Sequence, residues 1–474
     1  MINKTAPGIA GFDAAYTQLL KVRPGVLASE GGGELAWLRQ ARDRDAKIWR
    51  SSGLPTRRDE NWKYVSLAPM QDATILFSKE FSLAQLPPRE QFASLPVENA
   101  VEIVFMNGHF LRSWSKMPAQ SGLQIEALSE ILEECVEKGW SAERLQRFAA
   151  FQHQVENADG DRETVFSAMN TSFMPDALLI SVAPHIAVTD PIVIYHFTSS
   201  DGATANGKLL DKSLEISAPR IFVEVKEKAE LALMEFFSGD AAHPYLNTSV
   251  SDIRVAHGAR LSYCNVQLEG SEAYHIATTR IHQAKDSWVE TQQFSFGGKL
   301  SRHDLHLSLE GEGAEARVDG LYLTDGQQVV DNHTSIDHLV PNTMSRQLYK
   351  GILAGQSRAV FNGRVKIAKD AQKSNSSQLN NNLMLSSKAE VDTKPELAIF
   401  ADDVKAAHGA TIGQMDPEHL FYLQSRAIGK DQAMLILARG FALEVVYRIQ
   451  NNEMREQLLK LVTREMDQKL GETQ

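Results

Sequence analysis

One histidine stands in a setting that could support chemistry. His408 lies in the segment VKAAHGATIG, late in a run of short apolar segments separated by polar turns. An imidazole can bind a metal ion or move a proton near neutral pH, whereas a lone histidine is more often a hydrogen-bonded structural residue. The segment by itself leaves both interpretations open.

Four other histidines lie in strand-like segments. In an extended strand His303 and His306 face opposite sides, as do His333 and His338. The best local pair on one face is His306 with Glu310, but a metal site needs several ligands that converge on one ion. We therefore expect these polar side chains to lie on the protein surface.

Residues 202–209 come close to a phosphate-binding loop. They read GATANGKL, which has both glycines and the lysine of that motif. Leu209 stands where the motif needs a Ser or Thr hydroxyl for magnesium. The following segment, LLDKSLEIS, predicts a strand where the motif needs a helix. The sequence thus predicts an ordinary surface loop.

Thiol and hydroxyl nucleophiles have little support. The chain has two cysteines, Cys135 on the apolar stripe of a predicted helix and Cys264 on a predicted strand. Both are expected to be buried and inert. They are far apart, so the chain has no CxxC pair and no disulfide framework. No GxSxG elbow or SxxK motif occurs in a useful context.

The elements that must position these residues change character twice along the chain. Residues 1 to about 95 and 128–151 have helical spacing, and between them VEIVFMNGHFL predicts a hairpin that turns at Asn107-Gly108. The segment RRDENWKYVSL places Trp62 and Tyr64 among charges, which is typical of a helix end whose aromatic residues pack on the next domain. Short apolar segments of strand length then follow one another from Asp176 to Ile412.

These strands indicate a sandwich, a barrel, a propeller or a β-solenoid. Two features favour the solenoid. The β region covers about 235 residues, which is long for one sandwich or barrel. The Ser and Asn residues at 374–382 can stack as polar ladders between coils.

The chain after Gly413 is predicted to be helical. Ala433 to Val446 is apolar nearly all round, so this helix should be buried on most sides. Met454, Leu458, Leu461, Val462, Met466 and Leu470 form a one-sided stripe. That stripe can dock on the protein's own body, which we favour, or on a partner.

Composition narrows the class of protein. The chain has 474 residues and a net charge of −11, and the charge disfavours nucleic-acid binding. The N-terminus lacks the apolar core of a signal peptide, and the longest apolar segment is too short to span a bilayer. We therefore expect a cytoplasmic protein that binds neither nucleic acid nor membrane.

The C-terminal third of the chain resembles a known family. The segments NNNLMLSSKAEVDTKPEL and ELAIFADDVKAAHGATIGQMDPEHLFYLQSRAI are similar to the signature of the SufB/SufD family of iron–sulfur cluster assembly proteins. ENWKY near the N-terminus is similar to a short motif of the SufD branch. The resemblance covers most of the chain and is strongest from Leu321 to Tyr447.

The resemblance implies a fold and a set of partners. The family fold is a right-handed parallel β-helix flanked by helical domains, here 1–168, 169–412 and 413–474. A member of the SufD branch pairs with a SufB-like subunit through the β-helix and binds a SufC-like ABC ATPase through its C-terminal helices. It is a scaffold rather than an enzyme. A homodimer of the isolated chain is plausible, because an exposed strand edge can pair with another.

The resemblance also implies a role for His408. In the family, the histidine of this segment is implicated near the SufB–SufD interface, so His408 is our candidate metal residue, shared with a partner subunit. Some members carry a cysteine two residues earlier, where this chain has Ala406. The chain alone is expected to hold no cofactor stably, and an iron–sulfur cluster would bind only transiently in the complex. Imidazole can replace one of the thiolates that iron clusters prefer.

An alternative from a different class is a β-solenoid enzyme that acts on carbohydrates. Such an enzyme needs paired carboxylates in a cleft. Glu310, Asp331 and Asp337 are the acids to test, although their spacing is unconvincing.

Overall fold

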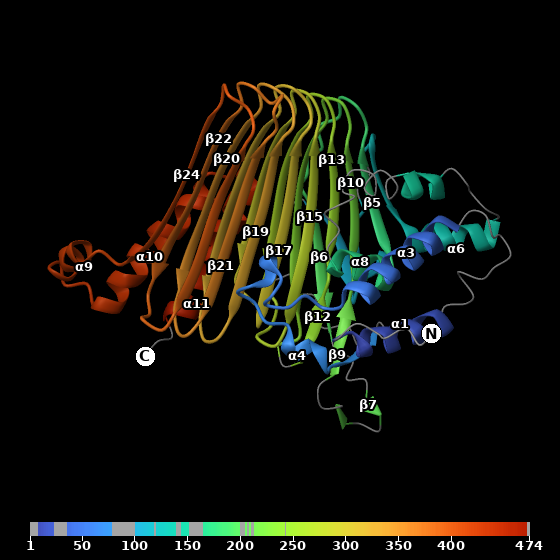
Figure 1. Cartoon of the computed structure of the whole chain (residues 1–474), viewed down its shortest axis with the longest axis horizontal. Helices are drawn as coiled ribbons and strands as arrows, with labels where there is room; N and C mark the ends of the chain where they lie inside the picture. The colour runs from blue at the N-terminus through green and yellow to red at the C-terminus, as the bar shows by residue number, and fades with distance from the viewer. Residues whose placement is uncertain are drawn as a thin grey trace.

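The computed structural model describes residues 8–22, 36–77, 100–117, 120–138, 144–150, 165–199, 204–205, 208–209, 213–241 and 243–471. Two large sheets lie face to face and dominate this structure (Figure 1). From β13 to β24, successive strands alternate between the two sheets, and every pairing among the strands from β13 onward is parallel. The chain therefore forms a parallel β-helix, which confirms the predicted fold class.

The two sheets have a regular strand order. Each residue pairs with one in the next coil, such as Asn381 with Thr411, which is 30 positions away. The first sheet runs β4 (Leu123–Ala127), β5 (Ala177–Val182), β10 (Arg220–Val225), β13 (Val250–Val255), β15 (Tyr274–Gln283), β17 (Leu300–Leu309), β19 (Val329–His338), β21 (Arg358–Ile367) and β23 (Glu390–Ile399). The second runs β3 (His109–Phe110), β2 (Val101–Met106), β6 (Ile192–Thr198), β11 (Glu230–Gly239), β14 (Arg260–Gln267), β16 (Trp288–Ser295), β18 (Glu315–Thr324), β20 (Met344–Leu353), β22 (Asn375–Met384) and β24 (Lys405–Gln414).

The space between the two sheets holds the main core. Alternate residues point inward, as a strand's two-residue period requires, and Leu305, Leu307 and Leu309 lie in this core. Polar residues share the interior in the later coils. Ser345 and Ser376 form a hydroxyl pair at 2.8 Å, which confirms the predicted polar ladder between coils.

One row of turns stacks along the β-helix. The residue at this turn has a positive φ in successive coils, and in six of them its N–H donates to a carbonyl of the next coil at 2.6–3.0 Å. The row contains His185, Lys228, Gly258, Asp286, Asn342 and Lys373. The backbone hydrogen bonds repeat from coil to coil and hold even lysine and aspartate in a conformation that glycine adopts most easily.

The hairpin predicted at Asn107-Gly108 is confirmed, because β2 and β3 pair as antiparallel strands at the start of the second sheet.

The N-terminal part covers the outer face of the first sheet. The helices here are α1 (Ala10–Val22), α3 (Ala36–Ser52), α4 (Ala68–Gln71), α6 (Leu128–Lys138) and α8 (Val165–Phe173), with short 3-10 turns at η1 (Glu60–Trp62) and η3 (Arg112–Trp114). Smaller strands are β1 (Thr74–Phe77), β9 (Ser213–Ser217) and β12 (Tyr245–Asn247), which join the first sheet.

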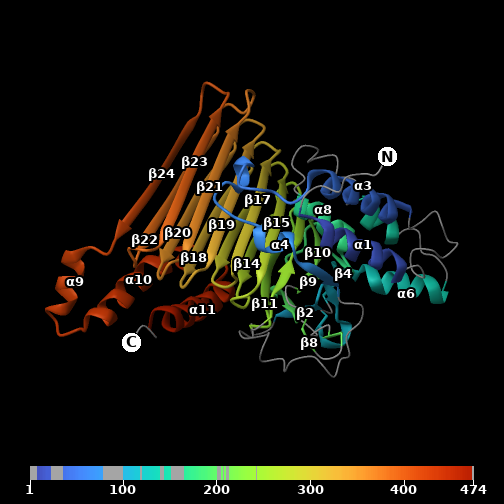
Figure 2. The same ribbon diagram turned by 60° about the horizontal axis from the view of Figure 1, so that its bottom comes forward.

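The C-terminal helices are α9 (Pro417–Gln424), α10 (Lys430–Tyr447) and α11 (Asn452–Gly471). Of these, α10 and α11 cover the outer face of the second sheet, and α9 projects beyond its last strand (Figure 2). The apolar stripe of α11 docks on the protein's own body, as favoured, with Met454, Leu458, Leu461, Val462 and Met466 buried.

The prediction that Ala433–Val446 is buried on most sides was wrong. Ala433, Ala438, Ala442, Val445 and Val446 of α10 are buried, but Ile436 is 40% exposed. The described elements that mainly contact α10 are α9, α11, β18 and β20, and they leave part of its apolar surface open. Among the described residues, no helix combines the length and apolar character that crossing a bilayer requires.

Candidate functional site at the last coil

The last coil of the β-helix has open strand edges. Among the described strands, β24 pairs only with β22, and β23 pairs only with β21. Most side chains of β24 are exposed, and Ile412 at its end is 55% exposed although its position faces the interior. An edge of this kind presents unpaired N–H and C=O groups that can pair with another strand.

His408 lies on this last strand and is exposed. Its register partner in β22 is Gln378, whose partner in β20 is Gln347. Both glutamines are buried, and Gln378 Nε2 donates to Gln347 Oε1 at 2.7 Å. His408 therefore stands on the interior side of the sheet, at the open end of a column of buried amides.

Ala406 shares this face with His408. It is half-buried and packs against the interior core, opposite Ser376 of β22. A methyl group here leaves the site without a thiolate. Cys264, which is closer to His408 in sequence than Cys135 is, lies fully buried on β14. Burial raises the pKa of its thiol well above the usual range. Its expected role as an inert buried residue fits this environment. The side chain of Cys135 lies outside the described residues.

The described residues contain no group of three His, Cys, Asp or Glu side chains that could hold a metal ion. His408 is thus a single accessible imidazole. Any ion bound to it would need further ligands from outside the described part of the chain.

The structure buries two histidines that the sequence placed on the surface. His303 Nε2 lies 2.9 Å from Thr279 Oγ1, and the two ring nitrogens of His338 lie 2.7 and 2.9 Å from hydroxyls of Thr343 and Ser345. Burial lowers the pKa of His303 to about 3 and that of His338 to about 4. The surface prediction was wrong because hydroxyl partners lie inside the β-helix, from the preceding coil for His303 and from the turn and strand that follow His338.

Glu310 does not pair with His306. It lies just beyond β17, and its Oε1 is 2.6 Å from Nδ1 of His282 in β15. The other two acids of the enzyme alternative also have partners of their own. Asp331 is 2.6 Å from Arg302, and the buried Asp337 is 3.4 Å from Ser335. The three carboxylates are engaged separately and do not form a catalytic pair.

Half of the residues of the near-match to a phosphate loop lie outside the described residues. Thr204–Ala205 (β7) and Lys208–Leu209 (β8) are described, and they pair as antiparallel strands. A phosphate-binding loop joins a strand to a helix. This hairpin therefore agrees with the predicted surface loop.

The ENWKY segment crosses the outer face of the first sheet, where the blue N-terminal trace lies over the strands (Figures 1 and 2). Trp62 is buried and its ring lies 4.0 Å from the Arg302 guanidinium, which confirms the prediction of aromatic packing on the next domain. Glu60 and Lys394 form an ion pair at 2.7 Å. Sequence reasoning missed Arg302, because nothing in LSRHDLHLSL marks it as buried.

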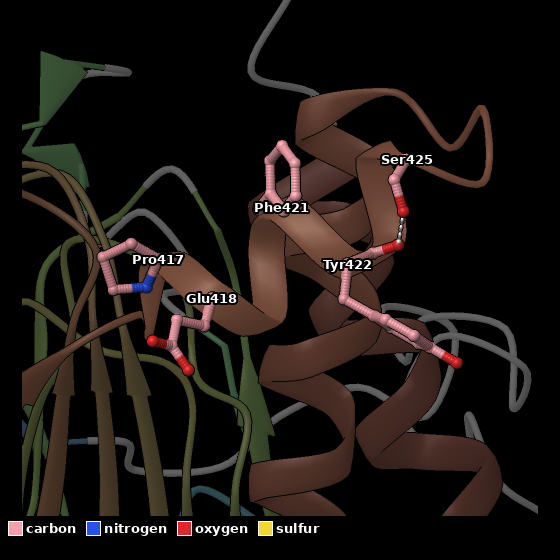
Figure 3. A pocket seen from close by; sticks show the side chains of 5 residues that line it. All are labelled: Pro417, Glu418, Phe421, Tyr422 and Ser425. Carbon is pink, nitrogen blue, oxygen red and sulfur yellow. Dashed lines mark hydrogen bonds between the residues drawn. The ribbon is translucent and has the colours of Figure 1, made fainter.

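A second exposed surface lies on the C-terminal helices. Figure 3 shows a shallow pocket lined by Pro417, Glu418, Phe421, Tyr422 and Ser425. Phe421 is 73% exposed, and α9 has no buried residue. Large aromatic residues on an exposed helix are typical of a protein-binding site.

The fold and these two surfaces define a β-helix protein with an open last coil. We call α9 together with the exposed side of α10 the exposed helical arm. Residues 208–441 match the family "SUF system FeS cluster assembly, SufBD core domain", and residues 13–194 match the "SufBD protein N-terminal region". The chain therefore belongs to the SufB/SufD family of iron–sulfur cluster assembly proteins.

Three relatives support this assignment over most of their length. A SufBD family protein of Synechocystis sp. is 30% identical, with 92% of this chain and 93% of the relative covered. The iron-sulfur cluster assembly protein SufD of Escherichia coli is 28% identical, with 86% and 88% covered. The chloroplastic protein ABCI7 of Arabidopsis thaliana is 30% identical, with 89% and 84% covered.

Proposed function

We propose that this chain is a scaffold subunit for iron–sulfur cluster assembly rather than an enzyme. The observation that carries the proposal is the open last coil, where an exposed His408 lies on an unpaired strand edge in a chain of this family. A SufB-like subunit pairs with this edge, and a homodimer is the alternative pairing of the isolated chain. The nascent cluster is cargo shared between the two subunits.

His408 contributes an imidazole to this shared site. The described part of the chain has no three-ligand group, so the partner subunit supplies the thiolates that iron requires. One imidazole among thiolates gives a more labile site, which suits a cluster that must be released.

The exposed helical arm binds a SufC-like ATPase. This surface consists of Phe421 and Tyr422 of α9 and the exposed side of α10. Apolar patches of this kind on a protein surface are commonly covered by a partner. The nucleotide chemistry then belongs to that ATPase, in agreement with the absence of the Ser or Thr from the loop that ends at Leu209.

Co-purification of the tagged chain with SufB-like and SufC-like subunits tests the proposal. We expect a complex of all three. His408→Ala should keep both partners and lower the iron content and cluster yield, because only a ligand is removed. Phe421→Asp should lose the ATPase and keep the SufB-like subunit. Capture of neither partner, or unchanged iron in the His408→Ala complex, would contradict the proposal.

A further inference from the structure

The amide column behind His408 has a direction. Gln378 Nε2 donates to Gln347 Oε1 at 2.7 Å, and Gln347 Nε2 donates to the Thr334 hydroxyl at 2.8 Å. Gln378 thus donates to the preceding coil, and Gln347 donates across the interior to β19 of the opposite sheet, so neither donor points toward the last strand. In a stacked amide ladder each carboxamide donates to one neighbour and accepts from the other.

The acceptor at the open end of this ladder is buried and unused. Gln378 is 1% exposed, and its Oε1 has no hydrogen-bond partner among the described residues. A buried carbonyl oxygen without a partner is energetically unfavourable. The next residue of the column is His408, and a ring N–H of its imidazole is a hydrogen-bond donor.

The strand of the first sheet that faces Gln378 leaves room for its side chain. Gly363 of β21 lies against it, and a Cβ on Gly363 would come within 2.1 Å of Gln378 Nε2. The side chain is thus confined between Gly363 and Gln347. A confined amide makes a better fixed acceptor than a mobile surface residue would.

We infer that Gln378 is a positioning residue for His408. In this structure Gln378 Oε1 has no partner in the described part of the chain, so the His408 ring must turn toward the interior before one ring N–H can donate to this oxygen. That hydrogen bond fixes the tautomer and leaves the other ring nitrogen with its lone pair free. A hydrogen bond of this type commonly decides which imidazole nitrogen is free to bind a metal. The inference rests on the proposed role of His408 at that end.

Side-chain 15N NMR of the full chain, labelled at histidine, tests this directly. The shifts of the two ring nitrogens report which one carries the proton, and the His408 signals are identified by their loss in His408→Ala. We expect a single tautomer of His408 in the wild-type chain. Wild-type signals that average two tautomers would overturn the inference without any further variant.

Three variants separate positioning from general stability. Gln378→Met removes the acceptor and should shift the His408 signals to the tautomer average. Gln378→Glu keeps an acceptor and should retain one tautomer. Gln347→Met, one coil deeper, is the matched control and should leave the His408 signals in place. Equal shifts in Gln347→Met and Gln378→Met would reject the inference. Iron content of the complex tests the proposed function separately.

Discussion

At the scale of single residues, Arg302 shows how a buried charge is held in this fold. It is 2% exposed, and its guanidinium lies 2.7 Å from Asp304 and 2.6 Å from Asp331. Trp62 covers its face. Burial alone would raise the pKa of Asp304, but the guanidinium charge outweighs that effect and lowers it to about 2.

Arg302→Met should lower the free energy of unfolding by about 3–5 kcal/mol, because it leaves two buried carboxylates without their cation. Urea unfolding followed by tryptophan fluorescence and circular dichroism measures the change. Lys394→Met breaks the exposed pair with Glu60 and serves as the control, with little change expected. If both variants unfolded at the same urea concentration as wild type, the cluster would not stabilise the fold.

At the scale of elements, glycine is favoured in the stacked turns, where the backbone has a positive φ, but not on the exposed side of α10. Gly258 has φ +64° and belongs to the turn row, where a side chain is strained. Gly440 lies on the exposed surface of α10, with nothing within 4 Å of the position of its Cβ.

The same substitution at these two glycines should have opposite effects. Gly258→Ala should destabilise the chain by roughly 1 kcal/mol or more, because alanine disfavours positive φ. Gly440→Ala should stabilise it by about 0.5–1 kcal/mol, because glycine weakens a helix interior. Thermal unfolding of both variants beside the wild type measures the signs. Destabilisation by both would contradict this account of α10.

At the scale of the whole molecule, the polar interior makes the β-helix sensitive to acid. His303 and His338 are buried in different coils, and burial lowers their pKa values to about 3 and about 4. In the unfolded chain a histidine titrates near 6.5. Below that pH the unfolded state binds more protons than the folded state, so stability falls as the pH falls.

Each buried histidine should lower the free energy of unfolding by about 1.4 kcal/mol for each pH unit as the pH falls from 6.5 to its folded pKa. The free energy of unfolding at pH 5 should therefore lie about 3–4 kcal/mol below that at pH 7 from these two residues alone. Urea titrations across this range measure the slope. His338→Gln keeps a neutral polar group beside Thr343 and Ser345 and should flatten the slope; a slope equal to that of wild type would reject the role of His338.

Sequence reasoning was most successful where a local rule applies. The two-residue period predicted inward leucines such as Leu305, Asn107-Gly108 predicted a hairpin, and the stripe from Met454 to Met466 predicted a docked helix. It failed for His303, His338 and Arg302. Their burial depends on partners across a turn, in an adjacent coil or in the N-terminal part, and a strand pattern does not reveal those contacts.

The sequence by itself determined the strand content, the helical ends and the family signature around His408, because spacing and residue type carry that information. The tertiary structure decided what surrounds His408. Strand register placed Gln378 and Gln347 behind it, and the end of the sheets left β24 without a second partner. Contacts between residues about 30 positions apart are set by the stacking of whole coils, so only the folded β-helix shows them.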